Sequence, residues 1–243
     1  MASLGLFVAL CLIILRNKRF GYEFTHILQL FLVIGICLLL GGKTLFIVTK
    51  IPDMIHNWSL QYVIQTIATS GIVFYGGLFG ALMGTIIFAK SRKMNVNQLF
   101  NFLVPAFLAF HIFGRIGCFL AGCCYGIEAS WGIAMASDPE VLRVPVQLIE
   151  AFCDLLIMIG ALRYEKRMVQ AKRNYSLLKI YLVSYAVCRF VLEFFRGDVI
   201  RGVWVLGLST SQIISIAIIL VLVSRRIFVK RKVKATPLME INK

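Results

Sequence analysis

One apolar stretch of the chain, residues 111–126, carries a histidine, an arginine and three cysteines. His111 and Arg115 are four residues apart, so a helix places both on one face. The planar guanidinium of Arg115 offers a fork of donors that fits a phosphate. Gly114 and Gly117 flank it and let another backbone or a lipid headgroup come near. The alternative is an arginine that extends to a membrane interface. We favour phosphate binding, because an ionisable residue at membrane depth is costly.

A second polar group lies in the run YAVCRFVLEFFRGD, residues 185–198. Arg189, Glu193 and Arg196 follow an i, i+4, i+7 spacing and share one helix face. Two arginines against one carboxylate leave a net positive charge, which suits a phosphodiester. A structural ion pair that joins two helices is the alternative and stays open.

Two further groups of residues are weaker evidence for a functional site, because a structural role explains each of them equally well. Gln147 and Glu150 are three residues apart behind Pro145, at an expected helix entrance, where they either bind a ligand or cap the helix. His111, considered alone, is more often a packed and hydrogen-bonded core histidine than a base.

Glycines recur in the run FYGGLFGALMG, residues 74–84. Gly80 and Gly84 fit close helix packing through small residues. The pair Gly76 and Gly77 could instead let a ligand approach the backbone. Tyr75 could place a hydroxyl there, or belong to the aromatic belt of a membrane interface.

Three clustered cysteines, Cys118, Cys123 and Cys124, allow several interpretations. A zinc site needs four donors; no CxxC pair or second cluster completes one, although His111 is a conceivable fourth ligand. A disulfide from Cys118 to either partner forms if the compartment oxidises. A nucleophilic thiolate beside Arg115 is also reasonable. We favour the plainest interpretation, small residues at a tight helix end, and expect no metal.

The elements that position these residues must be membrane helices. The 243 residues are 60% hydrophobic, with a mean hydropathy of +0.86 and a formal net charge of +15. The basic residues stand in short clusters between apolar runs, which is typical of cytoplasmic loops near anionic lipid and argues against nucleic-acid binding.

The pattern predicts an all-α, polytopic membrane protein. Basic clusters follow the first, third, fifth and seventh apolar runs, so the N-terminus is expected outside and the C-terminus in the cytoplasm. Residues 1–226 form the transmembrane domain and residues 227–243 a basic cytoplasmic tail. Lys43 and the segments 49–61, 122–144 and 196–204 then face outward. The seven expected spans are 2–15, 26–48, 62–89, 98–121, 145–163, 177–196 and 205–224.

Five motifs, taken in order, resemble the prolipoprotein diacylglyceryl transferase family of bacterial inner-membrane enzymes over nearly the whole chain. GGK, residues 41–43, stands where that family has GGR, and FYGGL where it has FHGGL. GRIGCFLAGCCYG resembles GRIGNFINGELxG, RVPVQLIEA resembles RHPSQLYEx, and YAVCRFVLEFFRGD resembles YGxxRFxxEFxRxPD.

The resemblance implies transfer of the diacylglyceryl group of phosphatidylglycerol to the lipobox cysteine thiol of a prolipoprotein. Glycerol phosphate is released, and no cofactor is required. Arg115 and Arg189 match arginines of substrate binding and catalysis, and we add Tyr75 and His111 as catalytic candidates. The expected substrate-binding residues are Lys43, Gly76, Gly77, Gly114, Gly117, Cys118, Gly122, Gln147, Glu150, Glu193 and Arg196.

The chain also departs from the family motifs. Tyr75 replaces the motif histidine, Cys118 the signature asparagine, and Cys123 the motif glutamate. Tyrosine is a poor base at its ordinary pKa near 10, and His111 is a speculative substitute. Two alternatives therefore stay open: a related transferase with another acceptor, and a non-catalytic phospholipid-binding or transport protein.

Overall fold

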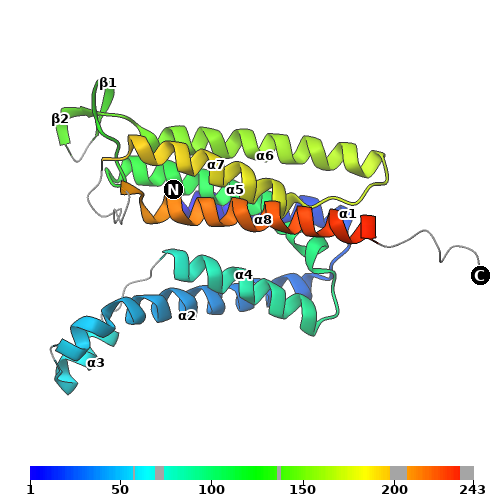
Figure 1. The fold of residues 1–243 in the computed structure, drawn as a ribbon, viewed down its shortest axis with the longest axis horizontal. Coiled ribbons are helices and arrows are strands. Elements are labelled where there is room, and N and C mark those ends of the chain that lie inside the picture. Colours follow the sequence, from blue (N-terminus) through cyan, green and yellow to red (C-terminus); the bar gives the residue numbers. More distant parts are fainter. Residues whose placement is uncertain (57, 69–73, 136–137, 198–206, 236–243) are drawn as a thin grey trace, which may run out of the picture. The chain divides into compact units, whose positions relative to one another are not determined.

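The structure, a computed structural model, describes all residues except 57, 69–73, 136–137, 198–206 and 236–243 (Figure 1). The chain divides into two compact units. One joins Met1–Leu15 to Asn101–Lys243, and the other is Arg16–Phe100. The expectation of a mostly helical protein is confirmed. The described elements are α1 (Ala2–Phe20), α2 (Phe24–His56), α3 (Leu60–Ala68), α4 (Phe74–Ser91), α5 (Val96–Leu120), β1 (Glu128–Met135), β2 (Asp138–Arg143), α6 (Val146–Gln170), α7 (Leu177–Leu192), the 3-10 turn η1 (Glu193–Phe195) and α8 (Thr210–Ala235).

Two of the described helices are long and apolar enough to cross a membrane, over Phe24–Ile51 and Val96–Leu120. Shorter apolar helices cover Gly76–Ser91 and Thr210–Ser224. The count of seven spans and the orientation of the termini stay predictions.

In the unit Arg16–Phe100, glycines bring α2 and α4 into close contact. A Cβ on Gly41 would clash with the carbonyl oxygen of Gly76, and one on Gly80 with the carbonyl oxygen of Cys37. A Cβ on Gly84 would lie 2.9 Å from the Cβ of Cys37. The predicted packing role of Gly80 and Gly84 is therefore confirmed.

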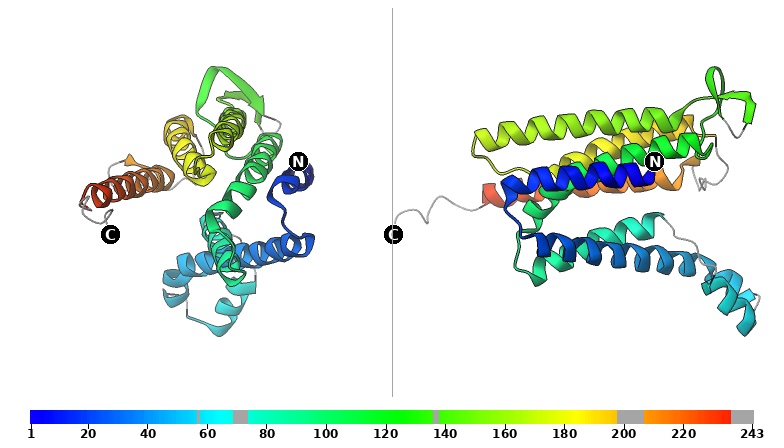
Figure 2. Two further views of the ribbon diagram at one scale, coloured as in Figure 1. Left: turned by 90° about the vertical axis from the view of Figure 1, so that its right-hand side faces the viewer. Right: turned by 180° about the vertical axis from the view of Figure 1, so that it is seen from behind.

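In the other unit, α7 packs against both α6 and α8, and α5 contacts α6 through His111 and Arg115; the left view of Figure 2 shows α6 and α7 nearly end on. The backbone N–H of Leu177, in the first turn of α7, donates to Asn101 Oδ1 at 2.8 Å. This bond satisfies a donor that a helix start leaves unpaired. The apolar core of these helices is formed by Val104, Leu108, Ala161, Leu177 and Tyr181.

The structure corrects several expected boundaries. Within the expected span 62–89 the structure describes two helices, α3, which ends at Ala68, and α4, which begins at Phe74; residues 69–73 lie outside the described residues. The segment 49–61 is not a loop throughout, because α2 continues to His56. Likewise α8 continues to Ala235, past the expected start of the tail at residue 227. The hydropathy pattern locates the apolar part of each helix. It does not mark the polar ends, where i→i−4 hydrogen bonds continue the helix.

The expected outer loop 122–144 contains an antiparallel hairpin, so the all-α prediction is incomplete. β1 pairs with β2, with Ala134 opposite Leu142 and Met135 opposite Asp138. Arg143 lies 3.3 Å from the carboxylates of both Glu128 and Asp138. The strands pair irregularly and lack a clean period of two, which hid them from the sequence pattern.

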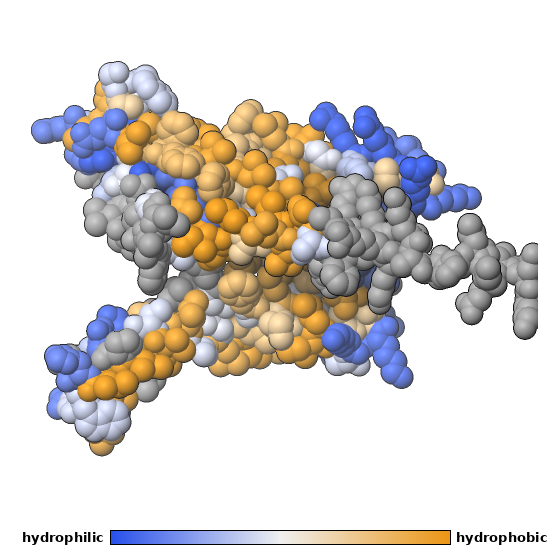
Figure 3. Space-filling model, in the orientation of Figure 1, coloured by the Kyte–Doolittle hydropathy of each residue, from blue (hydrophilic) through white to orange (hydrophobic). Residues whose placement is uncertain are grey.

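Large apolar side chains stay exposed along the helices. In Figure 3 the surface over α6 and α7 is apolar along its middle, and hydrophilic residues gather near the hairpin and at the far end of α6. Exposed apolar surface on this scale fits contact with lipid rather than water. On α2 it is formed by Leu28, Leu32, Ile36, Leu39 and Leu40.

Candidate functional site

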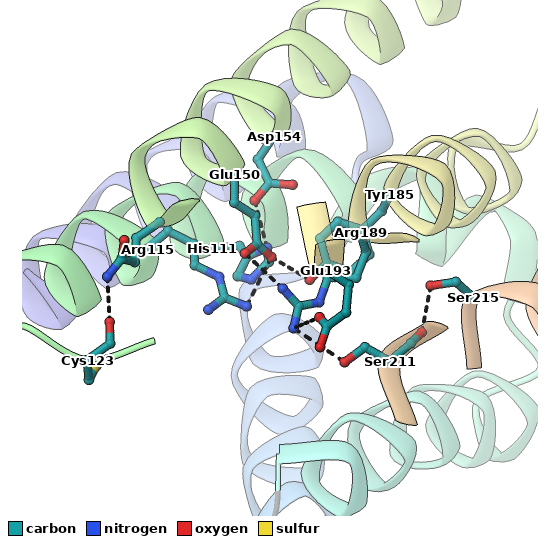
Figure 4. Close-up of polar contacts among 11 residues, drawn as sticks. His111, Arg115, Cys123, Glu150, Asp154, Tyr185, Arg189, Glu193, Ser211 and Ser215 are labelled. Carbon is teal, nitrogen blue, oxygen red and sulfur yellow. Dashed lines mark hydrogen bonds and ion pairs between the residues drawn. The ribbon is translucent and has the colours of Figure 1, made fainter. Parts of the chain in front are cut away.

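A buried carboxylate, Glu150 on α6, lies at the centre of a polar cluster (Figure 4). Arg115 of α5 places Nη2 3.0 Å from Glu150 Oε1, and Arg189 of α7 places Nη1 3.4 Å from Oε2. The hydroxyl of Tyr185 donates to Oε1 at 2.8 Å. Only 2% of Glu150 is exposed. Glu150 therefore joins α5 to α7 rather than capping a helix at the membrane surface.

Arg189 also contacts a second carboxylate, that of Glu193, and a serine of α8. Its Nη2 lies 3.0 Å from Glu193 Oε2 and donates to Ser211 Oγ at 3.3 Å. Ser215 donates in turn to the Ser211 carbonyl at 2.8 Å. The i, i+4 part of the predicted shared face is confirmed by the Arg189–Glu193 ion pair, and α8 contributes Ser211 to the same cluster. The expected place of Arg196 on that helix face is wrong, because α7 ends at Leu192 and Arg196 follows η1 in extended backbone, with φ of −80° and ψ of 138°.

One turn away from the Arg115–Glu150 pair lies a second pair between the same two helices. His111 Nδ1 is 2.8 Å from Asp154 Oδ2, and none of Asp154 is exposed. The ring of Tyr185 packs edge-on against the imidazole, with centroids 5.4 Å apart. His111 is thus a packed histidine held by a carboxylate.

Two arginines, Arg115 and Arg189, meet the carboxylates of Glu150 and Glu193 in this cluster, and the His111–Asp154 pair lies one turn away. The Nε of Arg115 is buried and, among the described residues, has no hydrogen-bond partner. An unpaired buried donor is costly, so this nitrogen is suited to an anionic ligand that supplies the missing acceptor.

A tight turn after α5 brings the three clustered cysteines together. Gly122 has φ of +67° and Cys124 of +59°, so the chain reverses through two left-handed residues. The backbone N–H of Cys123 donates to the Cys118 carbonyl at 3.1 Å. Gln147 Nε2 donates to the Cys123 carbonyl at 2.6 Å, so Gln147 holds the turn rather than capping α6. The three sulfur atoms lie within 4.8 Å of one another.

All seven cysteines are free thiols, so the disulfide considered for this cluster is not formed. The two cysteines of the turn differ in acidity. A hydrogen bond from the Cys118 thiol lowers the pKa of Cys124 to about 5, and the nearby Arg196 and Arg115 add to this effect. Burial raises the pKa of Cys123.

An apolar groove of about 600 Å³ opens beside the polar cluster, in the same unit. It lies between α6 and α7, with Trp131 of the hairpin and Phe195 of η1 at one end. The groove suits an acyl chain, because its walls are almost wholly apolar. Its lining includes Ile149, Leu156, Val187 and Val191.

The structure brings together most of the predicted site residues. Gln147, Glu150, Arg189, Glu193 and Arg196 lie with α5 in the unit that contains Asn101–Lys243. So do His111, Gly114, Arg115, Gly117, Cys118 and Gly122. Gly117 faces Met1, where a Cβ would lie 3.1 Å from the Met1 Cβ, whereas a Cβ on Gly114 would meet open space.

Four predicted residues lie in the other unit, Arg16–Phe100: Lys43, Tyr75, Gly76 and Gly77. The Tyr75 side chain is outside the described residues. Gly76 makes its close approach to α2, where a Cβ would lie 2.7 Å from the Leu45 Cβ. The binding roles of these four residues stay predictions.

Three members of the cluster were not singled out from the sequence: Asp154, Tyr185 and Ser211. Asp154 had a readable signal, since it is an acid inside the apolar run AFCDLLIM, four residues after Glu150. Tyr185 and Ser211 had none, because hydroxyls near helix ends are ordinary in membrane proteins.

Comparison with known proteins supports the resemblance found in the motifs. Residues 1–227 match the family model described as prolipoprotein diacylglyceryl transferase. A phosphatidylglycerol–prolipoprotein diacylglyceryl transferase of Clostridium tetani is 33% identical over 227 residues, covering 91% of this chain and 88% of that protein. A second enzyme of that name, from Clostridium perfringens, is 33% identical over 90% of this chain and 85% of its own length. One from Campylobacter hominis is 28% identical over 89% of this chain and 80% of its own length. The chain therefore belongs to the prolipoprotein diacylglyceryl transferase family.

Proposed function

We propose that this protein is a multi-pass enzyme of the bacterial cytoplasmic membrane that transfers the diacylglyceryl group of phosphatidylglycerol to the lipobox cysteine of a prolipoprotein. One observation supports the assignment for this chain: Arg115 and Arg189 converge on the single buried carboxylate of Glu150, and the Nε of Arg115 has no hydrogen-bond partner among the described residues. An anionic phosphodiester supplies the acceptor that this buried nitrogen lacks.

Arg115 is the residue that binds the phosphate. Its Nη2 is held by Glu150 at 3.0 Å, which fixes the plane of the guanidinium. Its buried Nε, without a partner among the described residues, is left to donate to a phosphate oxygen. Arg189 is held on both sides by Glu150 and Glu193, so its charge is fixed before substrate arrives.

The reaction moves charge onto the leaving group. The acceptor sulfur forms a bond to the terminal glyceryl carbon of the lipid, and the bond from that carbon to the phosphate oxygen breaks. The oxygen keeps the electron pair and leaves as glycerol phosphate, while the thiol proton passes to solvent or a base. The leaving phosphate gains a negative charge in this step, so arginines that are already oriented stabilise the transition state more than the ground state.

The apolar groove between α6 and α7 holds an acyl chain of the donor lipid. Ile149 and Cys188 in its wall precede Glu150 and Arg189 along their helices, so the groove passes the arginines at the same level of the helix bundle, within reach of a lipid headgroup. His111 is 9% exposed and paired with Asp154. Its role as the base stays a prediction.

The test uses purified protein in phosphatidylglycerol vesicles with a lipobox peptide, the same peptide with its cysteine replaced by serine, or no peptide. We expect glycerol phosphate release that requires the cysteine peptide, and a fall of at least about 100-fold for Arg115→Ala. Arg92→Ala is the matched control, because Arg92 directly follows α4, in the other unit, and donates to Gln29. Release at equal rates with all three additions would point to another acceptor, and retention of intact lipid without release would indicate a binding protein.

A further inference from the structure

The three sulfur atoms of Cys118, Cys123 and Cys124 form a cluster that the proposed reaction does not use. They lie within 4.8 Å of one another, and in the described part of the chain no further cysteine, histidine or carboxylate joins them. Cys118 is on the last turn of α5, and the other two are on the turn that follows.

The surrounding structure holds the cysteine turn in place on both sides. Gln147 of α6 binds the Cys123 carbonyl at 2.6 Å. Just beyond Cys124, the Tyr125 carbonyl accepts the backbone N–H of Gly197 at 3.0 Å. Contacts with α6 and with the segment after η1 already hold the three cysteines in place. Little conformational entropy is therefore lost when a ligand binds, and this favours binding.

Three convergent thiols are the ligand set of soft metal ions. Zinc binds thiolate sulfur at about 2.3 Å, which separates the sulfurs of a tetrahedral site by roughly 3.8 Å. The observed cluster, with all separations within 4.8 Å, reaches that geometry by changes of an ångström or less at side chains. Arg115 and Arg196 act electrostatically on Cys124, so they offset the negative charge of three thiolates.

We propose that Cys118, Cys123 and Cys124 bind one thiophilic divalent metal ion, zinc, through three thiolates, with the fourth position open. Cys123 is exposed and the other two are half-buried, so the open position faces the outside of the helix layer. Structural zinc sites have four protein ligands, whereas three protein ligands and an open position are typical of sites that bind a substrate.

The substrate that fits this position is a thiol, and this role rests on the proposed function. A zinc-bound thiol gives up its proton near neutral pH, so the metal would hold the acceptor cysteine as a thiolate near Arg115. The proton would leave to solvent, and the sulfur would bond to the glyceryl carbon as that carbon's bond to the phosphate oxygen breaks, with the electron pair leaving on glycerol phosphate. The product thioether would then leave the metal, because a thioether binds zinc weakly. The chain then needs no histidine at the position of Tyr75.

The binding test measures metal without activity. Reduced protein, freed of reductant, is titrated with Cd²⁺, which gives an ultraviolet charge-transfer absorption with thiolates, and zinc content is measured after equilibrium dialysis. We expect one ion per chain, with an affinity at least about tenfold weaker in Cys118→Ser, Cys123→Ser and Cys124→Ser. Cys11→Ser, on α1, is the matched control and keeps full binding.

Two results would overturn the site. One is binding that survives all three substitutions at the wild-type affinity. The other is a wild-type chain that binds no ion while a thiol count under denaturation finds two fewer than the seven cysteines, because a disulfide would then occupy the cluster. Circular dichroism of Cys123→Ser, whose side chain is exposed, checks that lost binding is not lost folding.

The role of the open position is tested with a lipobox peptide added to the Cd²⁺-loaded protein. We expect the charge-transfer absorption to rise by about one third, as a fourth thiolate joins three, and to stay unchanged with the serine peptide. An unchanged spectrum with both peptides would refute the thiol-binding role. Glycerol phosphate release, assayed separately, distinguishes that outcome from failure of the proposed function.

Discussion

In the unit Arg16–Phe100, α2 and α4 meet through glycines and backbone, whereas in the other unit α5 to α8 meet through arginines and carboxylates. A Cβ on Gly80 would strike the Cys37 carbonyl, and a Cβ on Gly41 would strike the Gly76 carbonyl. Glu150, by contrast, is almost fully buried between Arg115 and Arg189. Packing by small residues suffices for helix association in a membrane, so the buried charges of the second unit indicate a function beyond association.

The largest effect on stability is expected at Glu150. Glu150→Gln leaves Arg115 without its carboxylate partner, while Arg189 keeps Glu193, and an uncompensated buried charge costs about 3–5 kcal/mol. Reversible unfolding in mixed micelles measures the change. If Glu150→Gln is as stable as the wild type, the ion-pair cluster does not hold these helices together.

The next effect belongs to the glycine-packed unit. Gly80→Val forces a side chain against the Cys37 backbone and is expected to cost about 1–3 kcal/mol through overpacking. The same unfolding measurement reports the loss, and lipid transfer per folded molecule should stay at the wild-type level. A variant that is stable but inactive would mean that this contact serves the reaction directly, and the contrast between the units would fail.

A smaller effect is expected for Tyr185→Phe. The change removes one hydrogen bond to the charged Glu150, worth about 1.5 kcal/mol, while both arginines keep their ion pairs. A double-mutant cycle with Glu150→Gln should show strong coupling between the two positions. Additive losses would show that Tyr185 acts on something other than Glu150.

The smallest effect is expected at Gly35, on the same helix as Cys37. A Cβ at Gly35 would meet nothing within 4 Å, so Gly35→Ala should keep or slightly raise stability, by up to about 1 kcal/mol through helix propensity. Thermal unfolding in detergent detects the shift. If Gly35→Ala loses as much stability as Gly80→Val, contact between α2 and α4 is not what makes Gly80 sensitive to substitution.

The sequence predicted the helical class, the family and much of the polar cluster. Apolar runs locate helices because burial in lipid requires them, and Arg115, Arg189 and Glu193 stand out because charge is rare there. The i, i+4 spacing of Arg189 and Glu193 was enough to predict their shared face, and the structure shows their ion pair at 3.0 Å.

Other features depend on contacts between segments that are distant along the chain. Glu150 had two interpretations, and only the approach of α5 and α7 shows that it joins two arginines. The hairpin β1–β2 is held by pairing between irregular strands, which leaves no clear period in the sequence. The convergence of Cys123 and Cys124 on Cys118 depends on two left-handed residues of the turn, which spacing alone does not reveal.

Lipid binding tests the central claim, that the arginine cluster around Glu150 recognises the phosphate of an anionic lipid, most directly. Native mass spectrometry compares retention of phosphatidylglycerol and phosphatidylcholine, at equal concentration, by wild type, Arg115→Ala and Arg92→Ala. We expect wild type and Arg92→Ala to prefer phosphatidylglycerol and Arg115→Ala to lose that preference by at least about tenfold, as befits one lost charge-assisted hydrogen bond. Equal preference in Arg115→Ala, or an equal loss in Arg92→Ala, would contradict the account.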